Sequence, residues 1–273
     1  MPFIKARDET DLYVKDWGQG RPIVLIHGWP LSADSWDDIA YGLASAGYRV
    51  IAYDRRGFGR SGQPWTGYGY DTLADDLAAV IETAGLRDVT IAGFSMGGGE
   101  VARYLSRHDG RHVGKAVLIS SVVPHVQQSD ANPNGVSPEK LAEMRAQLIA
   151  DRPHFYGSFF PQFYGQGLLS HPVSNEVIDW SFAMAMQAGL QPTIAAFDSW
   201  AHTDFTADLP AFTVPTLIVH GDGDKAVPIG ATSAVAADAI PDARYLMYPG
   251  APHGLTVTDK DRLIADLRDF MAM

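Results

Sequence analysis

The sequence contains no cysteine, and this absence removes several kinds of chemistry. Disulfide bonds, iron–sulfur clusters, thiolate-ligated haem and cysteine nucleophiles are all excluded. Apolar stretches as long as the ~18 residues of a membrane span are also missing. The first residues lack the apolar centre of a secretion signal. We therefore expect no membrane partner and a cytoplasmic location.

Excess positive charge is absent as well. The chain has 21 Lys and Arg residues against 32 Asp and Glu residues, a formal net charge of -11. Binding of nucleic acid phosphates requires a basic face, so no nucleic acid partner is expected. The histidines show no metal-binding spacing such as H-E-x-x-H, and no metal is expected. A hydrophobic content of 46% over 273 residues is typical of a globular protein of one or two domains.

What the sequence does contain is a series of short, continuous apolar runs separated by helical segments. Runs of this kind are typical of strands buried on both faces, so we predict a mainly parallel, twisted sheet flanked by helices, an α/β fold. Residues 11–17 alternate in polarity and predict an antiparallel edge strand. Apolar spacing predicts helices over 72–84, 99–107 and 260–271. The predicted parallel strands are 23–26, 48–53, 89–92, 116–119, 216–219 and 245–248.

The strand and helix alternation stops between about residue 124 and about residue 210. A stretch of this length is too long for a loop in a compact domain, so we predict an inserted helical cap over 124–208. The α/β core predicted around it would comprise 1–123 and 209–273. Aromatic residues of the cap could form its own core or line a substrate pocket, and we predict pocket roles for Phe155, Phe159 and Phe160.

One serine has an unusual setting. Gly93–Gly97 reads G-F-S-M-G, and it lies between a predicted strand and a predicted helix. In the G-x-S-x-G arrangement the serine occupies a sharp, strained turn that exposes its hydroxyl. Ser95 is therefore a candidate nucleophile, although a serine at this place could also be a simple helix N-cap.

A serine nucleophile needs a base, and the base needs an orienting carboxylate. The segments H-G-D-G-D (220–224) and G-A-P-H-G (250–254) each follow an apolar run. Both should lie at the carboxyl edge of the sheet, where sites form in open parallel sheets. His253 is the best candidate base. Asp222 and Asp224 compete for the acid, and Asp222 could instead bind backbone amides of a turn.

The oxyanion of an acyl-transfer reaction needs two N–H donors that are already in place. One should be the N–H of Met96, which follows the serine. The other should come from the loop H-G-W-P, where Trp29 has an N–H and Pro30 has none.

Five motifs, H-G-W-P-L, Y-D-R-R-G-F-G-R-S, G-F-S-M-G-G-G-E, H-G-D-G-D and G-A-P-H-G, support a resemblance over nearly the whole chain. The sequence resembles the α/β-hydrolase superfamily and, within it, the cofactor-free haloperoxidase, aryl-esterase and perhydrolase subfamily. The resemblance implies an α/β-hydrolase fold and a triad of Ser95, Asp224 and His253. It also implies an oxyanion hole made by the N–H groups of Trp29 and Met96.

The same resemblance implies a serine hydrolase that cleaves small carboxylic or aryl esters without a cofactor. Hydrogen peroxide would replace water in a perhydrolysis reaction, and members of this family often self-associate, so a homo-oligomer is expected. Pro30 could aim its carbonyl at peroxide as part of the pocket, or could only stiffen its loop.

Alternative functions remain open from the sequence. A γ-lactamase or amidase of the same fold carries similar motifs, and a non-catalytic protein could use the scaffold to bind a ligand. Dehalogenases and epoxide hydrolases have aspartate where Ser95 stands. A G-x-G-x-x-G segment over 57–62 is not followed by a helix, so no dinucleotide cofactor is expected.

Overall fold

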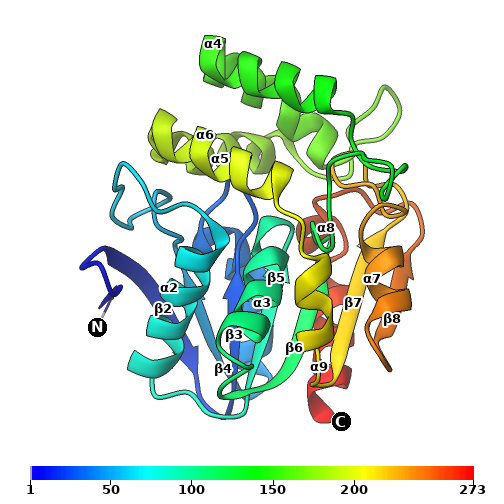
Figure 1. Ribbon diagram of the computed structural model, residues 1–273. Helices are drawn as coiled ribbons and strands as arrows, with labels where there is room; N and C mark the ends of the chain where they lie inside the picture. Colours follow the sequence, from blue (N-terminus) through cyan, green and yellow to red (C-terminus); the bar gives the residue numbers. More distant parts are fainter. Residues whose placement is uncertain (1) are drawn as a thin grey trace.

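The computed structural model describes residues 2–273, which form an eight-stranded sheet flanked by helices (Figure 1). The order of the strands is β1-β2-β4-β3-β5-β6-β7-β8. Strands β3 to β8 are mutually parallel, whereas β1 and β2 run antiparallel to their neighbours. The strands are β1 Phe3–Lys5, β2 Asp11–Gly18, β3 Arg21–Ile26, β4 Tyr48–Tyr53, β5 Val89–Phe94, β6 Val113–Ile119, β7 Thr216–Gly221 and β8 Arg244–Tyr248.

Five of the six continuous apolar runs are mostly buried in strands β3 to β7, as the sequence predicts, whereas β8 at the edge of the sheet has only Tyr248 buried. Every residue of β5 and β7 is buried, because helices cover both faces of the sheet. Strand β2 is antiparallel as predicted, but it is not the edge of the sheet, because β1 pairs with its outer side. The sequence does not predict β1, because this strand has only three residues and a single buried side chain, that of Ile4.

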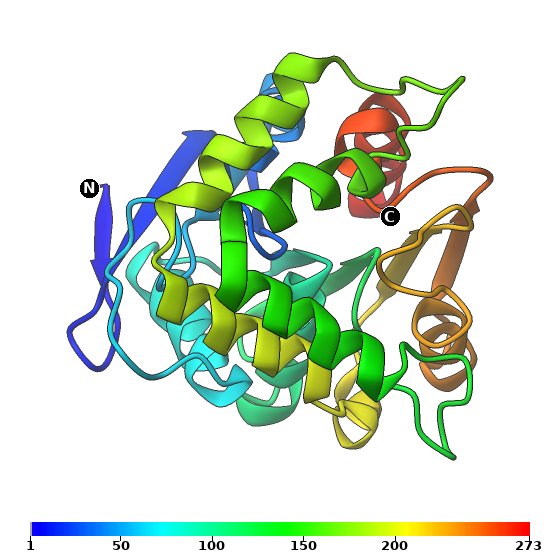
Figure 2. The same cartoon turned by 90° about the horizontal axis from the view of Figure 1, so that it is seen from above.

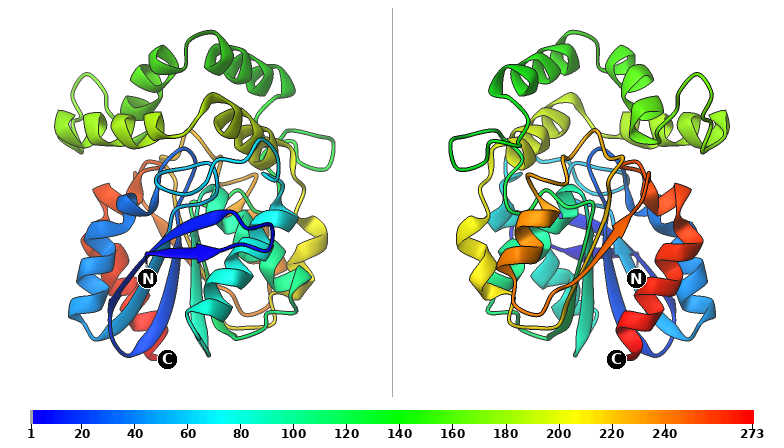
Figure 3. Two further views of the ribbon diagram at one scale, coloured as in Figure 1. Left: turned by 90° about the vertical axis from the view of Figure 1, so that its left-hand side faces the viewer. Right: turned by 90° about the vertical axis from the view of Figure 1, so that its right-hand side faces the viewer.

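Helices of the core occupy both faces of the sheet. Figure 3 shows α1 and α9 together on one face and α2 and α3 on the other. Helix α3 begins three residues earlier than predicted, because its first turn contains three glycines that carry no helical signal. The helices other than α4, α5 and α6 are η1 Ala33–Trp36, α1 Asp37–Ser45, α2 Tyr70–Thr83, α3 Met96–Arg107, η2 Thr206–Ala211, α7 Ser233–Ala239, α8 Leu255–Thr258 and α9 Lys260–Ala272.

Three α-helices between β6 and β7 lie over the carboxyl end of the sheet (Figures 1 and 2). They are α4 Pro138–Phe163, α5 Asn175–Gln187 and α6 Leu190–His202. Helix α4 is bent at Asp151, whose φ of -156° and ψ of 83° are not helical. The Asp151 carboxylate accepts a hydrogen bond from the His154 N–H at 3.0 Å and so starts a second helical half. In residues 2–273, none of the helices has both the length and the apolar character to cross a membrane.

The connection from β5 to α3 brings three pieces of backbone into direct contact. A Cβ atom on Gly93 would lie 2.2 Å from the carbonyl oxygen of Gly97. A Cβ atom on Gly97 would lie 2.5 Å from the carbonyl oxygen of Ile26, at the end of β3. Real Cβ atoms do not approach backbone oxygen this closely, so both positions require glycine.

Gly93→Ala should therefore destabilise the fold, because the new methyl group forces β5 and α3 apart. We expect the free energy of unfolding, measured by urea denaturation, to fall by about 1–3 kcal/mol. Gly157→Ala is the matched control. Gly157 lies in α4 with nothing within 4 Å of its added Cβ, so this variant should be unchanged or more stable by up to about 1 kcal/mol. Equal stability of the two variants would contradict the close packing described here.

Candidate active site

Ser95 lies at the turn between β5 and α3, with a φ of 54° and a ψ of -119°. A residue other than glycine at such angles costs of order 1–3 kcal/mol and persists only when its surroundings fix it. The Ser95 N–H donates to Ile119 O at 2.8 Å, and the Ser95 carbonyl accepts from the Gly98 N–H at 3.0 Å. These bonds fix the turn, so the Ser95 hydroxyl leaves the sheet at its carboxyl edge.

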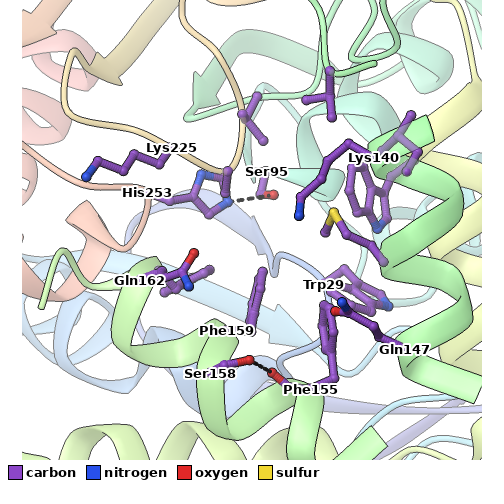
Figure 4. Close-up of a pocket in the computed structure, with 17 residues that line it drawn as sticks. Trp29, Ser95, Lys140, Gln147, Phe155, Ser158, Phe159, Gln162, Lys225 and His253 are labelled. Carbon is purple, nitrogen blue, oxygen red and sulfur yellow. Dashed lines mark hydrogen bonds between the residues drawn. The ribbon is translucent and has the colours of Figure 1, made fainter. Parts of the chain in front are cut away.

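The hydroxyl of Ser95 is the first member of a line of three side chains. Its Oγ lies 3.0 Å from Nε2 of His253 (Figure 4), and Nδ1 of His253 lies 2.6 Å from Oδ2 of Asp224. An ionised carboxylate can only accept, so Nδ1 of His253 carries the hydrogen of this bond. The free Nε2 can then accept the hydroxyl proton of Ser95, which is the arrangement that general base catalysis requires.

The carboxylate of Asp224 is buried and fully supplied with donors. Its Oδ1 accepts from the N–H groups of Ala226 and Val227, each at 2.8 Å. Its Oδ2 accepts from His253 and from Nε2 of His220, at 3.1 Å. Burial alone would raise the pKa of Asp224, but the two histidines outweigh this effect and hold the pKa well below its usual range. Asp224 is therefore ionised despite its burial.

The structure also tests the sequence predictions for Asp222 and His220, which lie near Asp224. Asp222 is exposed and accepts a hydrogen bond from the Gly250 N–H, so it has the turn role left open for it above. His220 makes structural hydrogen bonds as expected, with Nδ1 at 2.6 Å from Ser233 Oγ. Its contact with the carboxylate of Asp224 is not anticipated, although the four-residue spacing within H-G-D-G-D could have suggested it.

Two buried amides face no acceptor in the described part of the protein. Within residues 2–273, neither the N–H of Trp29 nor that of Met96 donates a backbone or side-chain hydrogen bond. Both residues are buried, and unpaired buried N–H groups are rare in folded proteins. The loop of Trp29 also approaches Ser95 closely, since a Cβ on Gly28 would lie 3.1 Å from Ser95 Cβ. The two amides can therefore serve an oxyanion formed at Ser95.

A cavity of about 190 Å³ opens beside Ser95 and His253, under the cap. Figure 4 shows the ammonium group of Lys140 pointing into the cavity and that of Lys225 pointing away from it. Much of the remaining wall is apolar, and its side chains come from both the core and the cap. They include Trp29, Met144, Phe155, Phe159, Phe163, Trp200 and Val227.

The aromatic residues of the cap divide between the cavity and the cap interior. Phe155 and Phe159 line the cavity and pack against the ring of Trp29, with centroids at 6.4 and 5.7 Å. Phe160 does not line it and is fully buried, which corrects the sequence prediction for this residue. Phe163 lines it instead, and the four-residue spacing of 155, 159 and 163, one face of a helix, could have shown this.

Pro30 requires a second correction. It is buried, but it is not among the residues that line the cavity. The neighbouring residue Trp29 lines the cavity, and of the two roles considered for Pro30 only the stiffening of its loop remains. The indole N–H of Trp29 donates to Thr193 O at 3.1 Å and so ties this loop to helix α6 of the cap.

Comparison with known proteins agrees with this geometry. Residues 21–259 match the family model described as the alpha/beta hydrolase fold. A non-heme haloperoxidase of Rhodococcus erythropolis is 44% identical over 272 residues, which are 99% of each chain. A bifunctional esterase/perhydrolase of Acinetobacter calcoaceticus is 37% identical over 274 residues, also 99% of each chain.

Solved structures give the same result. The crystal structure of a bromoperoxidase from Bacillus anthracis has a TM-score of 0.96 and 38% sequence identity, with 99% of each chain covered. Together with the sheet order, the turn at Ser95 and the cap, these similarities identify the family. The chain belongs to the α/β-hydrolase family, in the group of its non-heme haloperoxidases and esterases.

Proposed function

We propose that this chain is a serine hydrolase that cleaves small carboxylic or aryl esters through an acyl-enzyme and also catalyses perhydrolysis. One observation carries the proposal. The hydrogen-bonded line of Ser95, His253 and Asp224 ends beside two buried amides, of Trp29 and Met96, that have no acceptor among the residues that the structure describes. Relatives named as a haloperoxidase and as an esterase/perhydrolase support the same reading.

The first half of the reaction forms the acyl-enzyme. Oγ of Ser95 attacks the carbonyl carbon of the ester while Nε2 of His253 takes the hydroxyl proton. The carbonyl oxygen becomes an oxyanion and accepts hydrogen bonds from the N–H groups of Trp29 and Met96. Its collapse breaks the bond to the alcohol, which leaves with the proton from His253. Ionised Asp224 stabilises the imidazolium that exists between these two steps.

The second half of the reaction depends on the attacking molecule. Water gives up a proton to His253, attacks the acyl group and releases a carboxylic acid. Hydrogen peroxide reacts in the same way and releases a peracid, with Oγ of Ser95 recovering the proton in both cases. A peracid oxidises bromide in solution, so halide oxidation requires neither a redox cofactor nor a halide site in the protein.

The cavity limits the size and the polarity of the substrate. A volume of about 190 Å³ accommodates a small acyl or aryl group, and the aromatic wall favours apolar surface. The line of reacting groups would act equally on a strained γ-lactam amide, but no feature of the wall favours an amide over an ester. A panel of substrates therefore measures the preference directly.

Ser95→Ala should abolish ester cleavage and perhydrolysis together, because both pass through the same acyl-enzyme. We expect the kcat for p-nitrophenyl acetate to fall by about 10⁴-fold or more. Bromination supported by acetate, hydrogen peroxide and bromide should be lost as well, and so should any opening of a γ-lactam. Steady-state kinetics on the three reactions measures this, with circular dichroism to show that the variant is folded.

Ser106→Ala is the matched control, since Ser106 lies on the same helix and bonds to Asp208 instead of the reacting groups. It should retain all three activities. Ester turnover that survives in Ser95→Ala would refute the proposal. Bromination that survives while ester cleavage is lost would refute the shared intermediate. A wild-type protein without turnover on any substrate would favour a ligand-binding function.

Asp224→Asn should affect activity and acid stability separately. An amide at this position can donate to Nδ1 of His253 and so favours the wrong tautomer, and kcat should fall by about 10⁴-fold. The pKa of Asp224 is lower in the folded protein than in the unfolded chain, so its ionised form stabilises the fold above about pH 4. That contribution is lost as the pH falls toward the lower, folded pKa.

Urea denaturation between about pH 5 and pH 2 measures the second effect. The free energy of unfolding of Asp224→Asn should decline over this range by at least about 1 kcal/mol less than that of the wild type. An identical decline in the two proteins would show that Asp224 is not held ionised by its surroundings.

The cytoplasmic location and the self-association predicted from the sequence also belong to this proposal. Leu168 and Leu169 are fully exposed in the loop that follows α4. Contact between copies of the chain would remove these side chains from water. The mass of the protein in solution tests the prediction of self-association.

A further inference from the structure

A chain of buried polar side chains connects the nucleophile helix α3 with the loop that carries Trp29. Its members are Glu100, Arg55 and His27, each no more than 1% exposed. None of them lines the cavity, so none touches a substrate directly. Buried charged groups cost free energy unless they are paired. The three connected side chains are therefore expected to have a specific role.

The first link joins helix α3 to the loop after β4. Glu100 lies five residues after Ser95, and its Oε1 accepts a hydrogen bond from Nε of Arg55 at 2.5 Å. Its Oε2 accepts from the hydroxyl of Tyr53 at 2.6 Å. Burial raises the pKa of Glu100, while the charge of Arg55 acts in the opposite direction. The ion pair holds the guanidinium in one orientation.

The second link joins Arg55 to the loop after β3. Nη2 of Arg55 donates to His27 O at 2.5 Å, and the backbone N–H of Arg55 donates to Nε2 of His27 at 2.9 Å. A backbone N–H can only donate, so Nε2 of His27 carries no hydrogen. Burial, together with the charge of Arg55, holds the pKa of His27 well below its usual value, so the ring is neutral.

A neutral imidazole without a hydrogen on Nε2 must carry it on Nδ1. Nδ1 of His27 lies 2.9 Å from Gly28 O and therefore donates to this carbonyl. Nη1 of Arg55 lies 3.4 Å from the same nitrogen, but both atoms are donors, so this contact is not a hydrogen bond. The Leu31 N–H donates to Gly28 O as well, at 3.0 Å.

The carbonyl of Gly28 and the N–H of Trp29 belong to one peptide group. This peptide is trans, so the carbonyl and the N–H point in opposite directions from one rigid plane. Hydrogen bonds that fix the oxygen on one side therefore also fix the direction of the N–H on the other. His27 supplies one of the two bonds that hold this plane.

We propose that Glu100, Arg55 and His27 are positioning residues, which orient the peptide between Gly28 and Trp29 and aim its N–H at the oxyanion. The inference rests on the proposed function, because the oxyanion exists only in that reaction. The backbone N–H of Arg55 selects the tautomer of His27, and the tautomer sets the peptide, while the Glu100–Arg55 pair holds the backbone carbonyl of His27. These contacts hold helix α3 and the loop that carries Trp29 in a fixed position relative to each other.

The effect of this arrangement should appear in kcat and not in KM. The ground-state carbonyl makes weak use of the Trp29 N–H, whereas the oxyanion depends on it. Loss of a complete oxyanion donor lowers kcat by about 10²–10³-fold, and a misaimed donor should cost part of that. A side chain that serves only stability would have no such selective effect.

Two substitutions at position 27 separate the two hydrogen bonds of the ring. In His27→Asn the amide nitrogen can take the place of Nδ1 and still donate to Gly28 O. In His27→Gln the longer amide reaches the place of Nε2 and can accept from the Arg55 N–H, but it leaves Gly28 O without this donor. Both variants bury a neutral amide, so they serve as controls for each other in stability.

We expect His27→Gln to lower the kcat for p-nitrophenyl acetate by about 30-fold, with KM within about twofold of the wild type. Its affinity for phenylboronic acid, which forms a tetrahedral adduct with a reactive serine, should fall by a similar factor. His27→Asn should keep kcat and boronate affinity within about fivefold. Equal losses of kcat in both variants, or a change confined to KM, would overturn the proposal.

A measurement on the wild-type protein guards against variants that fail to fold. Long-range ¹H–¹⁵N correlation spectra report the tautomer of each histidine, and His27 should be neutral with its hydrogen on Nδ1. A hydrogen on Nε2, or a charged ring, would overturn the proposal without any substitution. Failure of the proposed function looks different, since turnover would then survive in Ser95→Ala whatever the state of His27.

Discussion

The backbone of Ser95 lies in the left-handed region, and the geometry of the whole site depends on this turn. It raises the Ser95 hydroxyl from the sheet and, in the same step, presents the N–H of Met96. The turn has a cost of order 1–3 kcal/mol, which the neighbouring strands offset by holding it at both ends. The close backbone contacts at Gly93 and Gly97 explain why glycine surrounds this serine.

The second requirement is a set of dipoles that are in place before any substrate arrives. Four donors hold the carboxylate of Asp224, so its charge needs no further partner to stay buried. Both proposed oxyanion donors belong to peptides that are fixed from their carbonyl side. Gly28 O accepts from His27 and Leu31, and Ser95 O accepts from Gly98. Preorganised groups of this kind lower the barrier without reorganising during the reaction.

Much of this architecture follows from local sequence patterns. Continuous apolar runs predict the parallel strands, and the G-x-S-x-G turn predicts the place of Ser95 between β5 and α3. The place of His253 and of the pair Asp222 and Asp224 follows from their position after predicted strands, since such loops meet at one edge of the sheet, while the choice of Asp224 rests on the family resemblance. Each of these inferences needs only the immediate neighbours of a residue.

The features that the sequence does not predict depend on contacts between distant segments. The hydrogen bond of His220 to Asp224 and the path from Glu100 to His27 require the loops to be placed in space. The four-residue spacing places Phe155, Phe159 and Phe163 on one face of α4, but only the packing of the half of α4 beyond Asp151 decides that this face meets the cavity. Strand β1 has a single buried side chain and gains its identity only by pairing with β2.

A covalent intermediate on Ser95 is the central claim of this account, and it can be observed directly. The protein would be mixed with p-nitrophenyl acetate, quenched in acid within the time of one turnover, digested and mapped by mass spectrometry. The account predicts one acetyl group, located on Ser95 and removed when turnover is allowed to finish. An acetyl group that forms and turns over on a different residue, or rapid turnover in which none is trapped on Ser95, would contradict it.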